Sequence, residues 1–506
     1  MKRLLILILI SIAIRILLPI DFPLDNDEAL YAQILSEMIQ HPSIYTNYMG
    51  EYVPWKPPLM FYVYSGIAKL LMPFGIQTEV LYRLPNLIFA VLTTVAFYFL
   101  TKNLTKDEDL SFIAALVLTS APMFMVTNTL LMTDNLLLFF VVSSLAVYTL
   151  KETERQPALF LIGGALAFLA FFTKSLASFI ILPLIIADYF INNKKTLKNG
   201  YFLTSLLLPF LAVLVLSSVF GEAWLRQYFI DAGRITLGTS KGVTGTFEFI
   251  LENLAVYAAL LLPWLSFGLS TLIVKKKRDQ IDLKLGLFLM FWLIFFIPPL
   301  IIPSALFWYA LPVLPAFAIF VAYEAKSEKF DWLSKLFLAV LIILSVAFSY
   351  MMANEFAKDL RIQQKDAGMY LSGKDGVAVI GRYSPGLLYY KFNNEDLPYN
   401  RTLILFLANS GDTRIDNQTM IELRSFVSNG RPIDKTLVGN YLIALYGPAL
   451  ASPINVQGDM DMWIKYVVLD AAVSNLREIF SQEIDQGRLK LIYNNKRYYI
   501  YEKVAG

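Results

Sequence analysis

The sequence has no cysteine and only one histidine, His41, in 506 residues. Without cysteine the chain has no thiolate nucleophile, no intrachain disulfide and no cysteine-ligated zinc site. A single histidine also leaves almost no basis for a Ser-His-Asp triad or a histidine-rich metal site. Any catalysis by this protein must therefore use carboxylates, lysine, arginine or tyrosine.

Charged residues are also scarce, because they make up 16% of the chain while hydrophobic residues make up 57%. A mean hydropathy of +0.56 excludes a soluble domain of this length and indicates a membrane protein. The formal net charge of +3 is no evidence of a nucleic-acid partner, since basic residues in membrane proteins mostly set the topology. The lipid bilayer is thus the partner that the composition predicts.

Long apolar runs recur from the first residues to about residue 353, and about 20 apolar residues suffice to cross a bilayer. We predict eleven spans, near residues 4–20, 83–101, 110–127, 131–150, 158–172, 176–191, 201–220, 253–274, 284–301, 306–324 and 332–353. The first run follows Lys2 and Arg3 as a signal peptide would, but no small-residue cleavage site comes after it. We therefore expect a retained span.

Basic residues are unevenly distributed between the predicted loops. The run KKKR at 275–278 lies in a predicted inner loop, whereas the turns around 128–133 and 302–306 hold no lysine or arginine. The positive-inside rule then predicts a cytoplasmic N-terminus. We expect the protein in the plasma membrane. With eleven spans, residues 21–82, residues 221–252 and everything after residue 353 face outward.

After residue 353 the apolar stretches become short and alternate with helical patterns. Stretches such as GVAVIG, TLILFLANSG and YVVLDAA read as strands, and LKLIY and RYYIYEK read as a hairpin that turns at Asn494–Asn495. The predicted fold is therefore an α-helical polytopic membrane domain, residues 1–353, followed by an extracytoplasmic α/β domain, residues 354–506. We interpret the second domain as an appendage to the first.

Four acidic residues follow the first span, namely Asp21, Asp25, Asp27 and Glu28. From Leu30 onward the apolar residues recur at helical spacing, which predicts an amphipathic helix lying on a surface. A purely structural explanation is available: Asp25 can cap this helix, Glu28 can complete a capping box and Asp27 can complement the helix dipole. The dipole term is only about 0.3–1 kcal/mol, so Asp27 remains available for a second role.

Other charges lie near the same predicted membrane face. Asp134 lies at the outer end of the fourth span and Lys174 at the turn after the fifth. Helix capping by Thr133 or Asp134, and snorkelling of Lys174 to the interface, are the alternative explanations. Arg15, inside the first span, needs an acid from another span as its partner. Further outer cations are Lys56, Arg83, Arg226 and Arg234. Together, two acids and several cations on one face suggest an anionic lipid headgroup.

Six motifs in this order resemble one known family. They are DEALYA, WKPPL, YRLPNLIFAVLTTVAFYFL, LTSAPMFMVTNTLLMTDNLLLFF, GGALAFLAFFTKS and IIPSALFWYALPVLPAFAIF, and they cover about residues 1–325. This series is similar to the polyprenyl-phosphate-sugar-dependent glycosyltransferases of the GT-C superfamily, especially the protein O-mannosyltransferases and the lipid A aminoarabinose transferases. The resemblance implies a polyprenyl-phosphate-linked sugar donor and a lipid, glycan or protein acceptor.

The resemblance also implies roles for individual residues. The family's catalytic Asp corresponds to Asp27, next to Glu28, and its second acid to Asp134. Donor-phosphate contacts correspond to Lys56, Arg234 and Tyr309, and we group Lys174 with them. A carboxylate would act as general base while the cations stabilise the departing lipid phosphate, and a single displacement would invert the anomeric centre.

No cofactor is required for this chemistry, because the lipid phosphate is already the leaving group. The DND sequence at 25–27 could ligate a divalent cation, which is the less favoured alternative. A metal-dependent oligosaccharyltransferase is one rival function, but its Trp-Trp-Asp-Tyr-Gly signature does not occur after residue 353. A non-catalytic lipid-linked sugar flippase is the other, and it predicts charges spread through the bilayer midplane.

Overall fold

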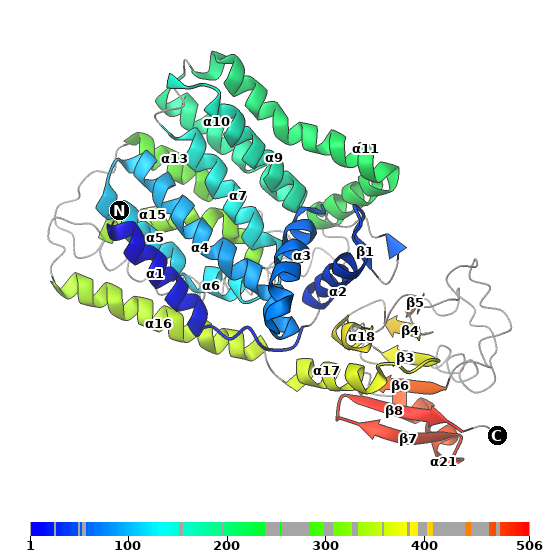
Figure 1. Cartoon of the computed structure of the whole chain (residues 1–506). Helices are drawn as coiled ribbons and strands as arrows, with labels where there is room; N and C mark the ends of the chain where they lie inside the picture. Colours follow the sequence, from blue (N-terminus) through cyan, green and yellow to red (C-terminus); the bar gives the residue numbers. More distant parts are fainter. Residues whose placement is uncertain are drawn as a thin grey trace. The chain divides into compact units, whose positions relative to one another are not determined.

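The chain folds into two compact units (Figure 1). The helical unit comprises residues 1–21, 43–46 and 53–355, and the C-terminal unit comprises residues 22–42, 47–52 and 356–506. The computed structural model describes residues 2–24, 27–48, 51–52, 57–150, 155–194, 196–237, 254, 283–297, 307–325, 332–356, 359–381, 385–392, 402–407, 441–446, 465–471 and 476–504.

The helical unit is built around a buried central helix, α7 (Thr133–Tyr148), which packs against α4 (Thr78–Thr105) and α9 (Leu159–Ser178). The remaining helices described in this unit are α1 (Lys2–Leu17), α3 (Leu59–Leu71), η1 (Met72–Phe74), α5 (Glu108–Thr119), α6 (Pro122–Asn128), α10 (Ile181–Asn192), η2 (Thr196–Lys198), α11 (Gly200–Leu237), α13 (Leu283–Ile294), η4 (Phe307–Val313), α15 (Leu314–Ala325) and α16 (Trp332–Phe356).

Two described helices are long and apolar enough to cross a membrane, namely α4 and the Gly200–Glu222 part of α11. A third span results if α5 and α6 form one bent span, and seven shorter apolar helices accompany them. The unit is therefore mostly helical, as predicted. The predicted span at 253–274 lies outside the described residues except for Leu254, and the count of eleven stays a prediction.

The predicted span at 110–127 is wrong as a single helix, because the chain bends by 56° between α5 and α6. Pro122 begins α6 and lacks the N–H that would continue the hydrogen-bond ladder of α5. The preceding residue, Ala121, is extended, as residues before proline usually are.

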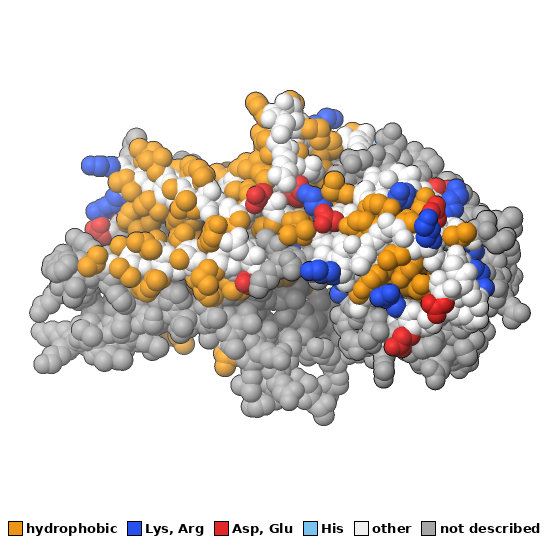
Figure 2. Space-filling model, turned by 90° about the horizontal axis from the view of Figure 1, so that it is seen from below, with side chains coloured by type: hydrophobic (Ala, Val, Ile, Leu, Met, Phe, Trp, Pro, Cys, Tyr) orange, Lys and Arg blue, Asp and Glu red, His pale blue; other side chains and the backbone are white. Residues whose placement is uncertain are grey.

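The outside of the helical unit carries the apolar side chains expected of a lipid-facing surface. Leu9 and Ile16 on α1 and Ile343 and Met351 on α16 are all exposed. Figure 2 shows hydrophobic side chains gathered over this unit, whereas lysine, arginine and acidic side chains are interspersed with them over the C-terminal unit. Because exposed apolar surface on this scale is rare in soluble monomers, this surface favours a membrane environment.

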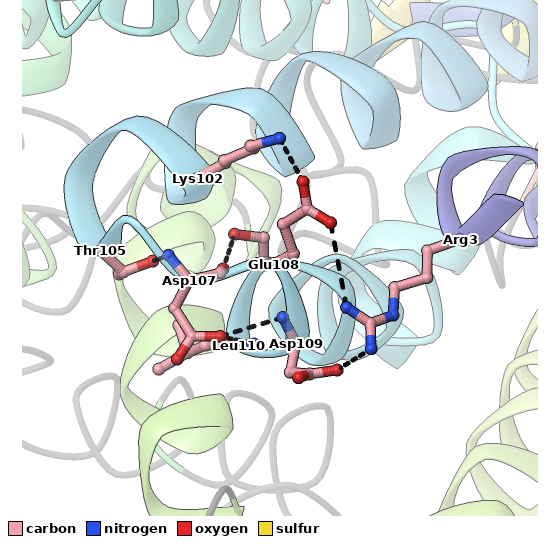
Figure 3. A network of polar contacts seen from close by, with 8 residues as sticks. Arg3, Lys102, Thr105, Asp107, Glu108, Asp109 and Leu110 are labelled. Carbon is pink, nitrogen blue, oxygen red and sulfur yellow. Dashed lines mark hydrogen bonds and ion pairs between the residues drawn. The ribbon is translucent and has the colours of Figure 1, made fainter. Parts of the chain in front are cut away.

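A network of charged side chains joins α1, α4 and α5 (Figure 3). Lys102 at the end of α4 pairs with Glu108, and Arg3 of α1 pairs with Asp109, both acids being in the first turn of α5. Asp107 caps α5 by accepting hydrogen bonds from two backbone N–H groups of its first turn. The ion pairs are about half exposed, so solvent screens them and each contributes little to stability.

The C-terminal unit contains a six-stranded mixed sheet in the order β5-β4-β3-β6-β8-β7. Its strands are β3 (Val377–Gly381), β4 (Thr402–Leu407), β5 (Tyr441–Tyr446), β6 (Tyr466–Asp470), β7 (Leu489–Asn494) and β8 (Tyr498–Lys503). β3 pairs in parallel with β4 and β6, while the other pairs are antiparallel. The predicted β7–β8 hairpin is confirmed, and the side chains of Asn494 and Asn495 accept backbone hydrogen bonds at its turn.

Helices and a second chain segment complete this unit. Its helices are α2 (Asp27–Gln40), α17 (Asp359–Leu371), α18 (Pro385–Phe392), α20 (Leu476–Ile479) and α21 (Ser481–Asp485), and β1 (Asn47–Tyr48) pairs with β2 (Glu51–Tyr52). α17 packs closely on α18 because Gly368 has no side chain. A Cβ there would lie 2.5 Å from the Leu387 carbonyl oxygen and 2.8 Å from Tyr390 Cβ.

Two expectations about the first loop differ from the structure. The sequence places α2 with the membrane domain, but α2 belongs to the C-terminal unit and packs against α18. The sequence also predicts that α2 lies on a surface, yet the polar residues Gln33 and Glu37 are buried along with its apolar face. The helical spacing of apolar residues correctly predicts a helix here. It cannot reveal that the helix packs against a partner more than 300 residues away along the chain.

Candidate active site

An acid, a cation and an aromatic ring meet inside the helical unit. Asp134 Oδ1 accepts a hydrogen bond from Lys174 Nζ at 2.7 Å, and the same ammonium lies 4.3 Å from the centroid of the Tyr309 ring. The Asp134 side chain is 4% exposed and the Lys174 side chain 20% exposed. The three residues come from α7, α9 and η4, so three separate segments converge on one buried ion pair.

The local structure explains why Asp134 is available for this pair. α7 begins at Thr133, and its N-cap is Met132, which makes no side-chain capping hydrogen bond. The explanation that Thr133 or Asp134 caps the helix is therefore not supported. Lys174 lies within α9, four residues before its end, and its ammonium contacts Asp134 and Tyr309 rather than snorkelling. Burial strengthens the attraction between the two charges.

Amide side chains anchor the chain around the start of α7. Asn86 of α4 donates to the Leu130 carbonyl and accepts from the Tyr64 hydroxyl, while Asn135 donates to the Thr127 carbonyl at 2.8 Å. Asn128 is fully buried, and neither polar atom of its amide has a hydrogen-bond partner among the residues that the structure describes. Buried polar groups are rarely left without hydrogen bonds in proteins, so the Asn128 amide could still bond to a ligand or to water.

Two cations singled out in the sequence have structural partners instead. Arg15 is buried and donates to the Thr119 hydroxyl at 2.6 Å and to the Thr119 carbonyl at 3.0 Å. The acid that we expected as its partner is absent from its contacts among the described residues. Arg83 is also buried and donates to the Ile20 carbonyl at 2.9 Å.

In the C-terminal unit the acidic residues of the first loop divide into two kinds. Asp27 is the first residue of α2 and is exposed. Glu28 is buried, and its Oε2 accepts a hydrogen bond from Arg361 Nη1 at 2.7 Å. The capping box that we expected would join Glu28 to Asp25, and Asp25 lies outside the described residues. Glu28 is thus held in a buried ion pair, whereas Asp27 faces solvent.

Other predicted site residues cannot be placed in the same way. Lys56 lies outside the described residues, and Arg234 is in α11 with its side chain outside them. Within the described part of the chain no group of three or more acidic or histidine side chains could hold a metal ion. The DND alternative includes Asp25 and Asn26, which are not among the described residues, and stays open.

Arg361 and the amide of Asn86 are the polar residues that sequence reasoning missed. Asn86 had a local signal, since it lies in the YRLPN motif inside an apolar helix. Arg361 had none, because its partner Glu28 is 333 positions away in the sequence.

Comparisons with known proteins agree with this architecture. Residues 55–219 match the family model described as dolichyl-phosphate-mannose-protein mannosyltransferase. ArnT from Cupriavidus metallidurans, solved bound to undecaprenyl phosphate, is similar in fold with a TM-score of 0.64 and 13% identity, over 99% of this chain and 98% of that one.

A second similar structure is the archaeal oligosaccharyltransferase AglB from Archaeoglobus fulgidus, in complex with an inhibitory peptide and a dolichol-phosphate. It has a TM-score of 0.53 and 15% identity, over 99% of this chain and 74% of that one. No curated protein sequence matches the chain. A segment of this chain thus matches that family model, and the fold of nearly the whole chain is similar to the folds of ArnT and AglB.

Proposed function

We propose that this protein transfers a sugar from a polyprenyl-phosphate donor to an acceptor hydroxyl, in the plasma membrane and on its outer face. The observation that carries the proposal is the buried Asp134–Lys174 ion pair against Tyr309, in a fold shared with a structure that binds undecaprenyl phosphate. Intramembrane ion pairs are costly and usually mark a substrate site. The acceptor hydroxyl belongs to a lipid, a glycan or a protein.

Lys174 has the chemistry to bind the donor phosphate. Asp134 and the ring of Tyr309 hold its ammonium in place, and a fifth of the side chain remains exposed. A phosphate oxygen approaching this ammonium would form a charge-assisted hydrogen bond, which is stronger where water is excluded. As the glycosidic bond breaks, negative charge grows on the phosphate, so the cation stabilises the transition state more than the bound donor. Lys56, Arg234 and the Tyr309 hydroxyl would add donors to the same phosphate.

Asp27 is our candidate for the general base. Its carboxylate is exposed at the first turn of α2, where it can accept a proton from an acceptor hydroxyl. Attack by that hydroxyl on the anomeric carbon, with departure of the polyprenyl phosphate, would invert the configuration in one displacement. Glu28 is buried in its pair with Arg361, which favours a supporting role for it over direct proton transfer.

The proposed reaction needs no bound metal. Lys174 and the other proposed phosphate ligands would stabilise the negative charge of the departing phosphate. They would supply the electrostatic stabilisation that a divalent cation would otherwise give. The rival function of a metal-dependent oligosaccharyltransferase has one observation in its favour, the fold similarity to AglB.

The deciding experiment incubates the purified protein with a panel of polyprenyl-phosphate sugars and measures released polyprenyl phosphate. Release that depends on an added acceptor supports the proposal. Movement of intact donor from one leaflet of a vesicle membrane to the other, with no release of polyprenyl phosphate from any donor in the panel, would favour the flippase. It would contradict the proposed transferase activity.

A further inference from the structure

Two helices of the C-terminal unit contact the residues on both sides of Asp27. The contacted residues are Phe22, Pro23, Leu24 and Glu28. Arg361 of α17 donates through Nη1 to the Pro23 carbonyl at 3.0 Å and to Glu28 Oε2 at 2.7 Å. Its guanidinium carbon also lies 5.2 Å from the centroid of the Phe22 ring. One side chain therefore contacts the chain both before and after Asp27.

Tyr390 of α18 adds a second point of attachment. Its hydroxyl oxygen accepts the Leu24 backbone N–H at 2.9 Å, only three residues before Asp27. α17 and α18 are packed at close range because Gly368 lets their backbones approach. Arg361 and Tyr390 thus belong to one tightly packed helix pair, which fixes residues 22–24 on one side of Asp27 and Glu28 on the other.

Burying the Glu28–Arg361 ion pair costs desolvation free energy, so attachment of the chain alone does not explain it. The Glu28 side chain is 1% exposed and that of Arg361 is 11% exposed, so both charges are largely desolvated. Apolar side chains of similar volume often hold such contacts with equal or greater stability, whereas a charged hydrogen bond fixes direction as well as distance. What the pair adds is orientation of the first turn of α2, and Asp27 is the first residue of that turn.

We propose that Arg361 is a positioning residue for Asp27, so that the C-terminal unit takes part in the transfer reaction by fixing the direction of the catalytic carboxylate. This inference rests on the proposed function, in which Asp27 is the general base. Arg361 touches neither donor nor acceptor in this scheme and acts through Pro23, Glu28 and Phe22. A small error in the placement of a catalytic group lowers turnover steeply, by as much as about 10²-fold for 1 Å.

The test compares Arg361→Gln with Arg497→Gln, a matched control in the same unit. Arg497 pairs with Asp470 at 2.7 Å, with side chains 18% and 1% exposed, so the control breaks a similarly buried ion pair that does not involve Phe22, Pro23 or Glu28. For Arg361→Gln we expect kcat per folded molecule to fall roughly 10–100-fold, with undecaprenyl phosphate binding unchanged. Arg497→Gln should lower thermal stability and leave kcat per folded molecule at the parental value.

Combination with Asp27→Asn separates positioning from general damage. If Arg361 acts through Asp27, adding Arg361→Gln to Asp27→Asn should cause no further loss of kcat. If Arg361→Gln does not fold, Arg361→Lys and Tyr390→Phe serve instead, because the first keeps the charge and the second removes a single hydroxyl. We expect partial loss of kcat in both, and again no further loss in the Asp27→Asn background.

The outcomes distinguish the inference from the proposed function. A folded Arg361→Gln variant with parental kcat, beside an inactive Asp27→Asn variant, would overturn the positioning role alone. A parental rate for Asp27→Asn would remove the general base and the positioning role with it. Full additivity of the two losses would also refute the inference, since it would show that Arg361 acts independently of Asp27.

Discussion

Lys174 Nζ lies 2.7 Å from Asp134 Oδ1 in the interior of the helical unit, although the two residues start from different helices, α9 and α7. The sequence presents them as separate candidates, each with its own structural explanation. Their pairing removes both explanations at once, since Asp134 does not cap α7 and Lys174 does not extend to an interface. The pair is the basis of the first prediction.

Asp134→Asn should weaken donor binding and lower stability. The variant removes the Asp134 carboxylate from beside the largely buried Lys174 ammonium, and loss of one partner of a buried pair costs roughly 3–5 kcal/mol. The one-fifth exposure of Lys174 puts the expected loss near the lower value. Thermal unfolding in detergent and a binding isotherm for undecaprenyl phosphate measure the two effects.

Two comparison variants sharpen this prediction. Lys174→Arg keeps a cation beside Asp134 and should retain much of the binding that Lys174→Gln loses. Lys102→Gln breaks the exposed pair of Lys102 with Glu108, whose side chains are 42% and 50% exposed, and should leave the melting temperature almost unchanged. Equal effects from the buried and the exposed pair would contradict a functional role for Lys174.

Asp27→Asn should fold, bind the lipid donor and lose about 10²-fold or more in kcat. The amide keeps the size of the side chain and its place at the start of α2, but it cannot accept a proton. Single-turnover release of polyprenyl phosphate measures the chemical step directly. Asp25→Asn is the control, and an equal loss in both variants would point to damage of the loop rather than to a general base.

Lys56→Ala and Arg234→Ala should each weaken donor binding or turnover by several-fold or more. Hydrogen bonds to charged groups contribute roughly 1.5–3 kcal/mol each, which corresponds to at least a tenfold change in an equilibrium constant. Titration with undecaprenyl phosphate, alongside kcat and KM for the donor, separates binding from turnover. Stable variants that transfer sugar at the parental rate would exclude these residues from the phosphate site.

Sugar transfer should survive prolonged treatment with EDTA. The proposed scheme places cationic side chains, not a metal, at the departing phosphate. Rates are compared before treatment, after treatment and after addition of Mg²⁺, Mn²⁺ or Zn²⁺. Loss of activity on chelation, with recovery on adding one of these metals, would favour the oligosaccharyltransferase alternative and draw attention to residues 25–27.

A reporter fused after residue 353 should be active only outside the cytoplasm. This outcome follows from the basic bias of the predicted inner loops and an odd number of spans. Enzymatic reporters that work on opposite sides of the membrane give complementary readings. Activity of the cytoplasmic reporter would reverse the topology and move the proposed site to the inner face.

The sequence predicts the helical fold well where a long apolar run becomes one helix, as in α4. It fails where local chemistry was overlooked, since Pro122 signals the end of α5 and the start of α6. It also identified Asp134 and Lys174 as candidates, because a charge beside apolar runs needs a reason. Arg361 could not be found in this way, because no local pattern links a residue to a partner on another segment.

The hydrogen bonds of Arg361 and Tyr390 to Pro23, Leu24 and Glu28 have a consequence for biosynthesis. The two contacts join residues 333 and 366 positions apart, so α2 leaves the ribosome long before its partner helices exist. At ~5–20 residues per second, the wait for Arg361 lasts about 15–70 s, while the intervening helices are inserted. A nascent chain cut short before α17 would therefore lack the contacts that Arg361 and Tyr390 make with Pro23, Leu24 and Glu28. The C-terminal unit includes residues 22–42, so this early segment completes its packing only after residues 356–506 have been synthesised.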